Sequence, residues 1–230
     1  MIKVNNITKT FQSGGIETTV LHGVTLEIPK GQFLAIMGRS GAGKSTLMYQ
    51  ISLLDRPSSG TIFVAGENAT DFSIKQATQF RLNNFGYIFQ DYALLPELTA
   101  VENVALPLLM LGIPLKIAKM RATNVLVKVK MDHRLGNLPS QLSGGEQQRV
   151  SVARAIVNEP SVIFADEPTA NLDVDNSIRV MDLLTELHNE GQTIVMVTHE
   201  EEYSKRAERI IKLSDGVIIS DLLLNHTQGA

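Results

Sequence analysis

A short apolar run that leads directly into a glycine-rich loop constrains the fold of this chain more than any other feature. Residues 33–37 read Phe-Leu-Ala-Ile-Met, which is typical of a buried strand. Gly38 to Thr46 form the loop, and residues 45–51 have the composition of a helix. Because such a strand–loop–helix unit belongs to parallel sheets, the sequence predicts an α/β fold.

The loop has the spacing of a phosphate-binding loop, in which Gly38 is followed by Gly43, Lys44 and Ser45. Glycines let backbone N–H groups approach a phosphate closely, and the helix N-terminus adds favourable partial charge. Lys44 is predicted to bridge the β- and γ-phosphates of a nucleotide, and the Ser45 hydroxyl to bind Mg²⁺. The residues predicted to contact the nucleotide here are Gly38, Arg39, Ser40, Gly41, Ala42, Gly43, Lys44, Ser45 and Thr46.

A second apolar strand ends in two carboxylates. Residues 162–165 are apolar, and Asp166 and Glu167 follow directly. Because an acid at the C-terminal edge of a parallel sheet can orient a metal ion, Asp166 is predicted to hold Mg²⁺ through water. Glu167 is predicted to be the general base for the attacking water. Paired acids after a strand also occur in ordinary turns, and the residues alone leave that alternative open.

The rest of the chain continues the alternation of strands and helices. Residues 91–141 are rich in Leu, Met, Lys and Ala, which predicts a helical insertion. Val180, Leu184 and Leu187 recur at helical spacing after it, as expected for a helix that covers a parallel sheet. Further strands are expected at residues 61–64, 87–89 and 193–197, with a closing hairpin at 209–212 and 217–219.

Residues 142–149, Leu-Ser-Gly-Gly-Glu-Gln-Gln-Arg, form a second glycine-rich helix start. Ser143 is a good N-cap, and Gly144 and Gly145 expose backbone N–H groups at the start of the helix, so this is a second anion site. The first loop already surrounds the phosphates of one nucleotide. The second site is therefore predicted to bind the γ-phosphate of a nucleotide held by another subunit.

The phosphate loop, followed far downstream by Leu-Ser-Gly-Gly-Glu at 142–146, resembles the ATP-binding cassette (ABC) ATPases. The resemblance covers residues 2–222. It implies a P-loop NTPase with a RecA-like core, a small antiparallel β portion and a helical insertion, in a single domain over 1–230. The core lobe is expected at 1–90 and 142–230, and the helical subdomain at 91–141. The resemblance also implies an ATPase with ATP and Mg²⁺ as cofactors, and an ATP-dependent homodimer with two ATP molecules sandwiched between the subunits.

The same resemblance assigns roles to four isolated residues. His199, after the strand at 193–197, matches a switch histidine that donates to the γ-phosphate, although a lone histidine is more often an ordinary surface residue. Gln90 matches the glutamine that touches Mg²⁺ or the lytic water. Phe11 matches an aromatic residue that stacks on adenine, with a place in the core as the alternative, and Asp173 matches an acid that aligns the two sites of the dimer. The signature residues expected to contact the nucleotide are Ser143, Gly144, Gly145 and Glu146.

Residues 88–104 resemble the MacB, LolD and FtsE group of these ATPases. That resemblance implies an integral membrane permease as partner, working in export, lipoprotein release or mechanical transmission. The alternative is an FtsE-like regulatory ATPase that controls cell-envelope enzymes. Ala170 departs from the family pattern, where a glycine is usual, and is expected to be tolerated as another small residue.

Composition limits the other possibilities. A formal net charge of −3 and a pI near 6.0 argue against a nucleic-acid partner. The chain has no cysteine, which excludes thiolate chemistry. Its longest apolar run, 104–115, spans about half of what a membrane helix needs, so we expect a peripheral position at the cytoplasmic face of the membrane through the partner.

Overall fold

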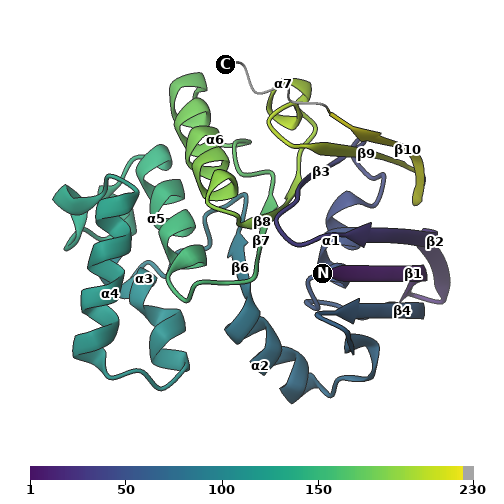
Figure 1. Cartoon of the computed structure of the whole chain (residues 1–230), viewed down its shortest axis with the longest axis horizontal. Helices are drawn as coiled ribbons and strands as arrows, with labels where there is room; N and C mark the ends of the chain where they lie inside the picture. The colour runs from purple at the N-terminus through teal and green to yellow at the C-terminus, as the bar shows by residue number, and fades with distance from the viewer. Residues whose placement is uncertain (225–230) are drawn as a thin grey trace. The chain divides into compact units, whose positions relative to one another are not determined.

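The computed structural model describes residues 1–224, shown in Figure 1. These residues form two compact units. The first unit joins residues 1–78 to the C-terminal part of the chain from Gly191 onward, and the second comprises residues 79–190. Because α2 (Ile74–Asn84) crosses from the first range into the second, the units are linked through a helix as well as through the chain after Glu190.

One part of the first unit is an antiparallel sheet. Its strands are β1 (Ile2–Ser13), β2 (Ile16–Ile28), β4 (Ser59–Val64) and β5 (Glu67–Asn68), in the order β2-β1-β4-β5. Ile2 and Val4 of β1 are buried and Lys3 between them is exposed, as period-two patterning requires. A register shift between Val4 and Ile7 then places Ile7 on the buried face as well. A short 3₁₀ helix, Ala69–Asp71, follows β5. The predicted small antiparallel β portion is confirmed.

The other part of the first unit is built around β3 (Phe33–Met37), whose five residues are all buried. β8 (Thr193–Val197) and β9 (Arg209–Ser214) pair in parallel with β3, and β10 (Val217–Leu223) closes an antiparallel hairpin with β9. The helices of this part are α1 (Lys44–Ile51) and the short α7 (Glu201–Ser204). The predicted strand at 33–37, the strand at 193–197 and the closing hairpin are confirmed.

The second unit contains one parallel strand pair and four long helices. β6 (Phe85–Ile88) pairs with β7 (Val162–Asp166). The helices are α3 (Ala100–Met110), α4 (Leu115–Lys128), α5 (Gly144–Ile156) and α6 (Val174–Asn189), with 3₁₀ turns at Asp132–Arg134 and Pro139–Gln141. Apolar residues that recur along one face of each helix are buried, including Val104 and Leu108 in α3.

The helical segment predicted for residues 91–141 is present as α3 and α4. Pro107 lies inside α3, a position where the missing N–H and the ring usually break a helix, yet the Leu111 N–H still donates to the Pro107 carbonyl at 3.1 Å. The lobe boundaries at residues 90 and 142 stay a prediction. No helix within residues 1–224 has the length and apolarity needed to cross a bilayer.

Candidate functional site

The predicted phosphate loop is a turn that only glycine fits at two positions. A Cβ on Gly38 would lie 2.3 Å from the Leu213 carbonyl oxygen, and one on Gly43 would lie 3.1 Å from the Val20 carbonyl oxygen. Gly43 is the N-cap of α1 with φ 95°, in the left-handed region. No side chain caps α1, and its first turn holds no acid. The start of this helix therefore keeps the character of an anion site.

Lys44 is buried in this loop, with 7% of its surface exposed. Its Nζ donates to the Arg39 carbonyl oxygen at 3.2 Å, and the Ala42 N–H donates to the same oxygen at 3.1 Å. Arg39, which was predicted as a nucleotide contact, thus contributes a backbone acceptor that shapes the loop. The loop thus holds a positive charge beside its backbone N–H groups, as the predicted contact with the β- and γ-phosphates requires.

His199 follows a strand that lies next to β3. Ile36 pairs with Val197, so Gly38 and His199 stand at the same carboxyl edge of the parallel pair. The Thr198 N–H donates to the Ile36 carbonyl oxygen at 3.2 Å, and the buried Thr198 accepts from the Glu200 N–H at 3.1 Å. The backbone around His199 is therefore fixed, while its side chain is exposed.

The second unit repeats this arrangement with β6 and β7. Ile88 pairs with Ala165, so Gln90 and Glu167 leave the sheet at the same carboxyl edge. Asn171 donates from Nδ2 to the Gln90 carbonyl oxygen at 2.9 Å, which ties the two loops together. Glu167 has φ 44°, a left-handed conformation that costs a non-glycine residue roughly 1–3 kcal/mol. Stored strain of this kind is found at functional positions, and it falls on the predicted general base.

The donor types predicted for a metal fit Mg²⁺. A serine hydroxyl, a carboxylate and an amide oxygen are hard ligands of the kind that Mg²⁺ prefers. Asp166 ends β7 with 7% of its surface exposed. Within residues 1–224 no three His, Cys, Asp or Glu side chains gather into a metal cage. Such a site suits Mg²⁺, which is commonly held by one or two carboxylates together with phosphate oxygens and water.

The signature segment begins α5 with a complete capping box. The Glu146 N–H donates to the Ser143 hydroxyl at 3.3 Å, and the Ser143 N–H donates to Glu146 Oε2 at 2.8 Å. Arg134 Nε donates to Glu146 Oε1 at 2.9 Å. Burial by itself would raise the pKa of Glu146, but these hydrogen bonds outweigh it and lower the pKa below its usual value. The carboxylate is thus fixed as part of the helix start.

Close packing is a second reason why glycine stands at positions 144 and 145 of the signature. A Cβ on Gly145 would lie 2.2 Å from Asn176 Oδ1, and one on Gly144 would lie 2.8 Å from the Tyr92 hydroxyl. Asp173 is the N-cap of α6 and accepts from the Asn176 N–H at 2.8 Å, which lowers its pKa. This cap was not predicted from the sequence, although an Asp before an amphipathic helix is its usual signal.

Phe11 lies in β1 with 44% of its surface exposed, so the alternative of a core position is wrong. The ammonium of Lys9 stands 5.0 Å from the centre of its ring, and that ammonium also pairs with Asp55 at 2.7 Å. An exposed aromatic ring supported by a fixed cation is suited to stacking on a flat ligand.

Each unit thus carries part of the predicted site. The first holds the phosphate loop, Phe11 and His199, and the second holds Gln90, Asp166 and Glu167, the signature and Asp173. Supporting residues that sequence reasoning missed include Asn171, which holds Gln90, and Gln148, whose Nε2 donates to the Pro168 carbonyl oxygen at 2.6 Å. Both amides lie in segments that the sequence resemblance covers, but spacing along the chain does not indicate which carbonyl oxygen each would reach.

Residues 21–170 match the family model described as ABC transporter. The chain belongs to the ABC transporter family. Among curated relatives, the "Macrolide export ATP-binding/permease protein MacB" of Bartonella quintana is 47% identical over 96% of this chain and 34% of its own length. The protein of that name from Vibrio parahaemolyticus is 47% identical over 97% of this chain and 34% of its own. The chain therefore spans about a third of the length of these relatives.

Solved structures of ABC cassettes share the fold. The ATP-binding cassette MJ0796, described as a dimer in a post-hydrolysis state bound to ADP and Pi, is 38% identical, with a TM-score of 0.91 over 98% of this chain and 99% of that one. CbiO1 from Clostridium perfringens, described as part of an ABC transporter complex, is 29% identical, with a TM-score of 0.84 over 96% of this chain and 87% of that one. The predicted ABC ATPase fold, ATPase class and resemblance to MacB are confirmed.

Proposed function

We propose that this ABC ATPase binds MgATP, dimerises around two nucleotides and uses their hydrolysis to drive an integral membrane permease. The observation that carries the proposal is the presence of two glycine-rich helix starts in one chain, at Gly43 and at Ser143. Each is a site for phosphate oxygens. One chain needs only the first to hold its own nucleotide, and the second is available to the nucleotide of a partner.

The residues divide the reaction between them. Lys44 and the backbone N–H groups of the loop after Gly38 bind the phosphates. Ser45 and Asp166 would hold Mg²⁺, and Gln90 would touch Mg²⁺ or the lytic water. Phe11 stacks on adenine. Bound Mg²⁺ would add charge neutralisation at the β- and γ-phosphates.

Chemistry at the γ-phosphate falls to two residues of this chain. Glu167 accepts the proton of the attacking water, in the manner of a general base. His199 donates to a γ-phosphate oxygen and stabilises the charge that develops during transfer.

Dimerisation supplies the second half of each site. In this proposal, Ser143, Gly144 and Gly145 bind the γ-phosphate held by the other chain, and Asp173 aligns the two sites. The MJ0796 cassette is described as a dimer at 39% identity to this chain, which supports the same assembly here.

The partner is a membrane permease of the MacB kind, on the same polypeptide or a separate one. The curated relatives carry the words "export ATP-binding/permease" in their names, and this chain matches about a third of their length. That similarity supports export over the regulatory FtsE-like role, with the chain held at the cytoplasmic face of the membrane by its partner. The exposed Leu95, after the Gln90 loop, is a candidate contact for that partner.

Sedimentation of the Glu167→Gln variant tests the assembly. With ATP it should form a dimer that persists, because the bound nucleotide is not consumed, and without ATP it should be a monomer. Adding Ser143→Arg should abolish the dimer while ADP affinity is kept. The matched control is Ser161→Arg, which should leave the dimer intact. Ser161 is exposed and lies directly before β7, at the end opposite Glu167. A dimer that survives Ser143→Arg would remove the signature from the partner's nucleotide site.

A further inference from the structure

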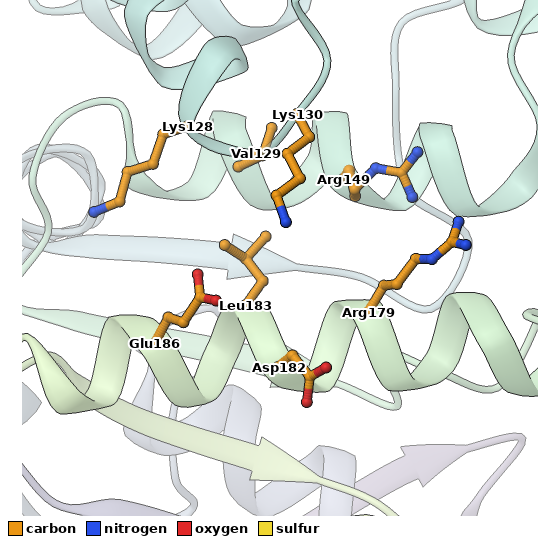
Figure 2. A pocket seen from close by; sticks show the side chains of 8 residues that line it. All are labelled: Lys128, Val129, Lys130, Arg149, Arg179, Asp182, Leu183 and Glu186. Carbon is orange, nitrogen blue, oxygen red and sulfur yellow. The ribbon is translucent and has the colours of Figure 1, made fainter.

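A pocket in the second unit carries more positive than negative charge. Its volume is about 340 Å³, and it lies between the chain around the end of α4, the side of α5 and the exposed side of α6 (Figure 2). Val129 and Leu183 give it an apolar floor. The residues that line it are Lys128, Val129, Lys130, Arg149, Arg179, Asp182, Leu183 and Glu186.

The charges are distributed unevenly along the pocket. Lys128 is already paired, because its ammonium lies 2.6 Å from Glu190, outside the lining. In Figure 2 the Asp182 carboxylate is turned away from α5, and Glu186 lies toward the Lys128 end. Arg149 and Arg179 stand at the end opposite Lys128, and Lys130 stands between the two ends in Figure 2. None of these three cations has an ion-pair partner within the described part of the chain.

Two of these cations act on each other. Figure 2 shows the guanidinium groups of Arg149 and Arg179 turned toward each other from α5 and α6. Burial lowers the pKa of Arg149, the charge of Glu146 opposes that change, and the charge of Arg179 adds to it. Arg149 Nε is buried without a hydrogen-bond partner in residues 1–224, and Nη1 reaches Asn176 Oδ1 only at 3.5 Å. A guanidinium pair in this state is stabilised by an anion placed between its members.

Lys130 adds an independent observation. It follows the C-cap of α4 with φ 60°, in the left-handed conformation for which glycine is the usual residue. Its N–H donates to the Val127 carbonyl oxygen at 2.9 Å, as such a helix end requires. A lysine here carries backbone strain that glycine would avoid. Its ammonium points into the pocket toward α6 in Figure 2, so the strained position supplies a charge.

We propose that the part of this pocket that faces Lys130, Arg149 and Arg179 binds a phosphate group. Two guanidinium forks can each donate two N–H groups to phosphate oxygens, and the lysine adds a compact positive charge. Glu186 and the C-terminal end of α4 bring negative charge nearby, so we expect a dissociation constant on the order of 1 mM. The same chemistry is offered by free inorganic phosphate and by the headgroup of an anionic phospholipid.

Residue-resolved NMR of the ¹⁵N-labelled, nucleotide-free full chain tests the site. Inorganic phosphate should shift the Lys130 amide and the Nε–H signals of Arg149 and Arg179 along one saturable curve. Signals of Gly43 report the nucleotide loop separately, so the two sites are distinguished in one titration. Sodium chloride at matched ionic strength should not reproduce the shifts. A response confined to the Gly43 region, or equal responses to phosphate and chloride, overturns the proposal.

Variants separate binding from folding. Lys130→Gly removes the cation and relieves the backbone, so the thermal midpoint should hold or rise while the dissociation constant for phosphate rises at least fivefold. Arg179→Gln should weaken binding to a similar degree, and Lys116→Gln, on α4 outside the pocket, should not. Parental affinity in both pocket variants overturns the proposal.

Vesicles identify the source of the phosphate group. In a flotation assay, phosphatidylcholine vesicles with and without phosphatidic acid are compared. Binding to the acidic vesicles that is lost in Lys130→Gly assigns a lipid headgroup, whereas phosphate binding without vesicle binding assigns the free anion. Failure of both probes overturns the site.

Discussion

The chain has two glycine-rich helix starts, and they differ in how their first turns are capped. At α1 the N-cap is Gly43, no side chain caps the helix, and the first turn contains no acid. At α5 the Ser143 hydroxyl and the Glu146 carboxylate close a capping box, and Arg134 holds the carboxylate in place. The start of α1 therefore receives no acceptor from a capping side chain, whereas α5 supplies one from its own Ser143.

This difference indicates how the two loops work. In the proposed dimer, a nucleotide would complete the first loop, whereas the capping box holds the second in shape before the other chain's nucleotide binds. The N-caps also differ in backbone conformation, since Gly43 is left-handed with φ 95° and Ser143 is extended, and the predicted general base Glu167 is left-handed with φ 44°. We therefore propose that the two helix starts bind nucleotide and that Glu167, directly after β7, accepts the proton.

The largest effect should come from Glu167→Gln, which separates binding from chemistry. Losing a general base slows a reaction by about 10²–10⁴-fold, so hydrolysis should fall by that factor while ATP still binds. That loss corresponds to roughly 3–5.5 kcal/mol of transition-state stabilisation. Steady-state phosphate release measures it, with Glu67→Gln, an exposed change on β5, as control. Turnover within threefold of the parent would exclude Glu167 from proton transfer.

Gly43→Ala breaks the first helix start. The left-handed backbone costs an alanine about 1–2 kcal/mol, and its Cβ would press on the Val20 carbonyl oxygen, so the loop should shift and ADP affinity should fall at least tenfold. Calorimetric titration with ADP measures the affinity. Gly66 has φ 89° and open space around it. The control Gly66→Ala therefore carries the same backbone cost without touching the loop, and its ADP affinity should equal that of the parent. Equal affinity in both variants would show that the loop tolerates a Cβ.

Ser143→Ala should lower the free energy of unfolding and leave the affinity for the nucleotide in the chain's own phosphate loop unchanged. Removing a serine N-cap typically costs about 1 kcal/mol, which thermal or urea unfolding can measure. ADP affinity should not change, because the cap belongs to the other helix start. Ser161→Ala, also exposed, gives the baseline for losing a serine. If the two serine variants are equally stable, the capping box contributes nothing and the contrast with α1 fails.

The smallest effect concerns the capping box at the start of α3. Hydrogen bonds from the Thr99 side chain and backbone, and then from Lys119, lower the pKa of Glu102 from 4.5 to about 2. Since the folded pKa is depressed, the stabilisation is present above pH 4.5 and is lost as the pH falls toward 2. Glu102 is partly exposed, so the contribution is small. The difference in thermal midpoint between the parent and Glu102→Gln should therefore narrow from pH 7 to pH 3. A constant difference would show that the carboxylate's charge does not matter there.

Much of the architecture followed from local pattern. The run at 33–37, the loop from Gly38 to Thr46 and the helix after it were predicted from residue spacing, because apolar runs and glycine positions are dictated by local backbone requirements. The helix α2 was not predicted. Ile74 is 80% exposed and Ala77 is its only buried residue, so the helix has no apolar stripe by which sequence could reveal it.

The residues of the site also divide into those that local sequence predicts and those that it does not. Ser143 as an N-cap was predicted from its neighbours, since capping is a local property. His199, Gln90 and Phe11 could be named only through resemblance to a family, because a single histidine, glutamine or phenylalanine carries no pattern. The hydrogen bond from Asn171 to Gln90 and the strained backbone of Glu167 depend on how distant segments pack, which spacing along the chain does not encode.

The claim that the two helix starts of one chain serve two different nucleotides can be tested by mixing two inactive variants. Lys44→Ala disables the first helix start, and Ser143→Arg disables the second. In a head-to-tail dimer of one chain of each kind, one composite site has both parts intact. The account predicts that an equimolar mixture, at a concentration where the parent is active, hydrolyses ATP several-fold faster than either variant alone. A mixture no faster than the average of the two variants would contradict it, because both helix starts would then serve the same nucleotide.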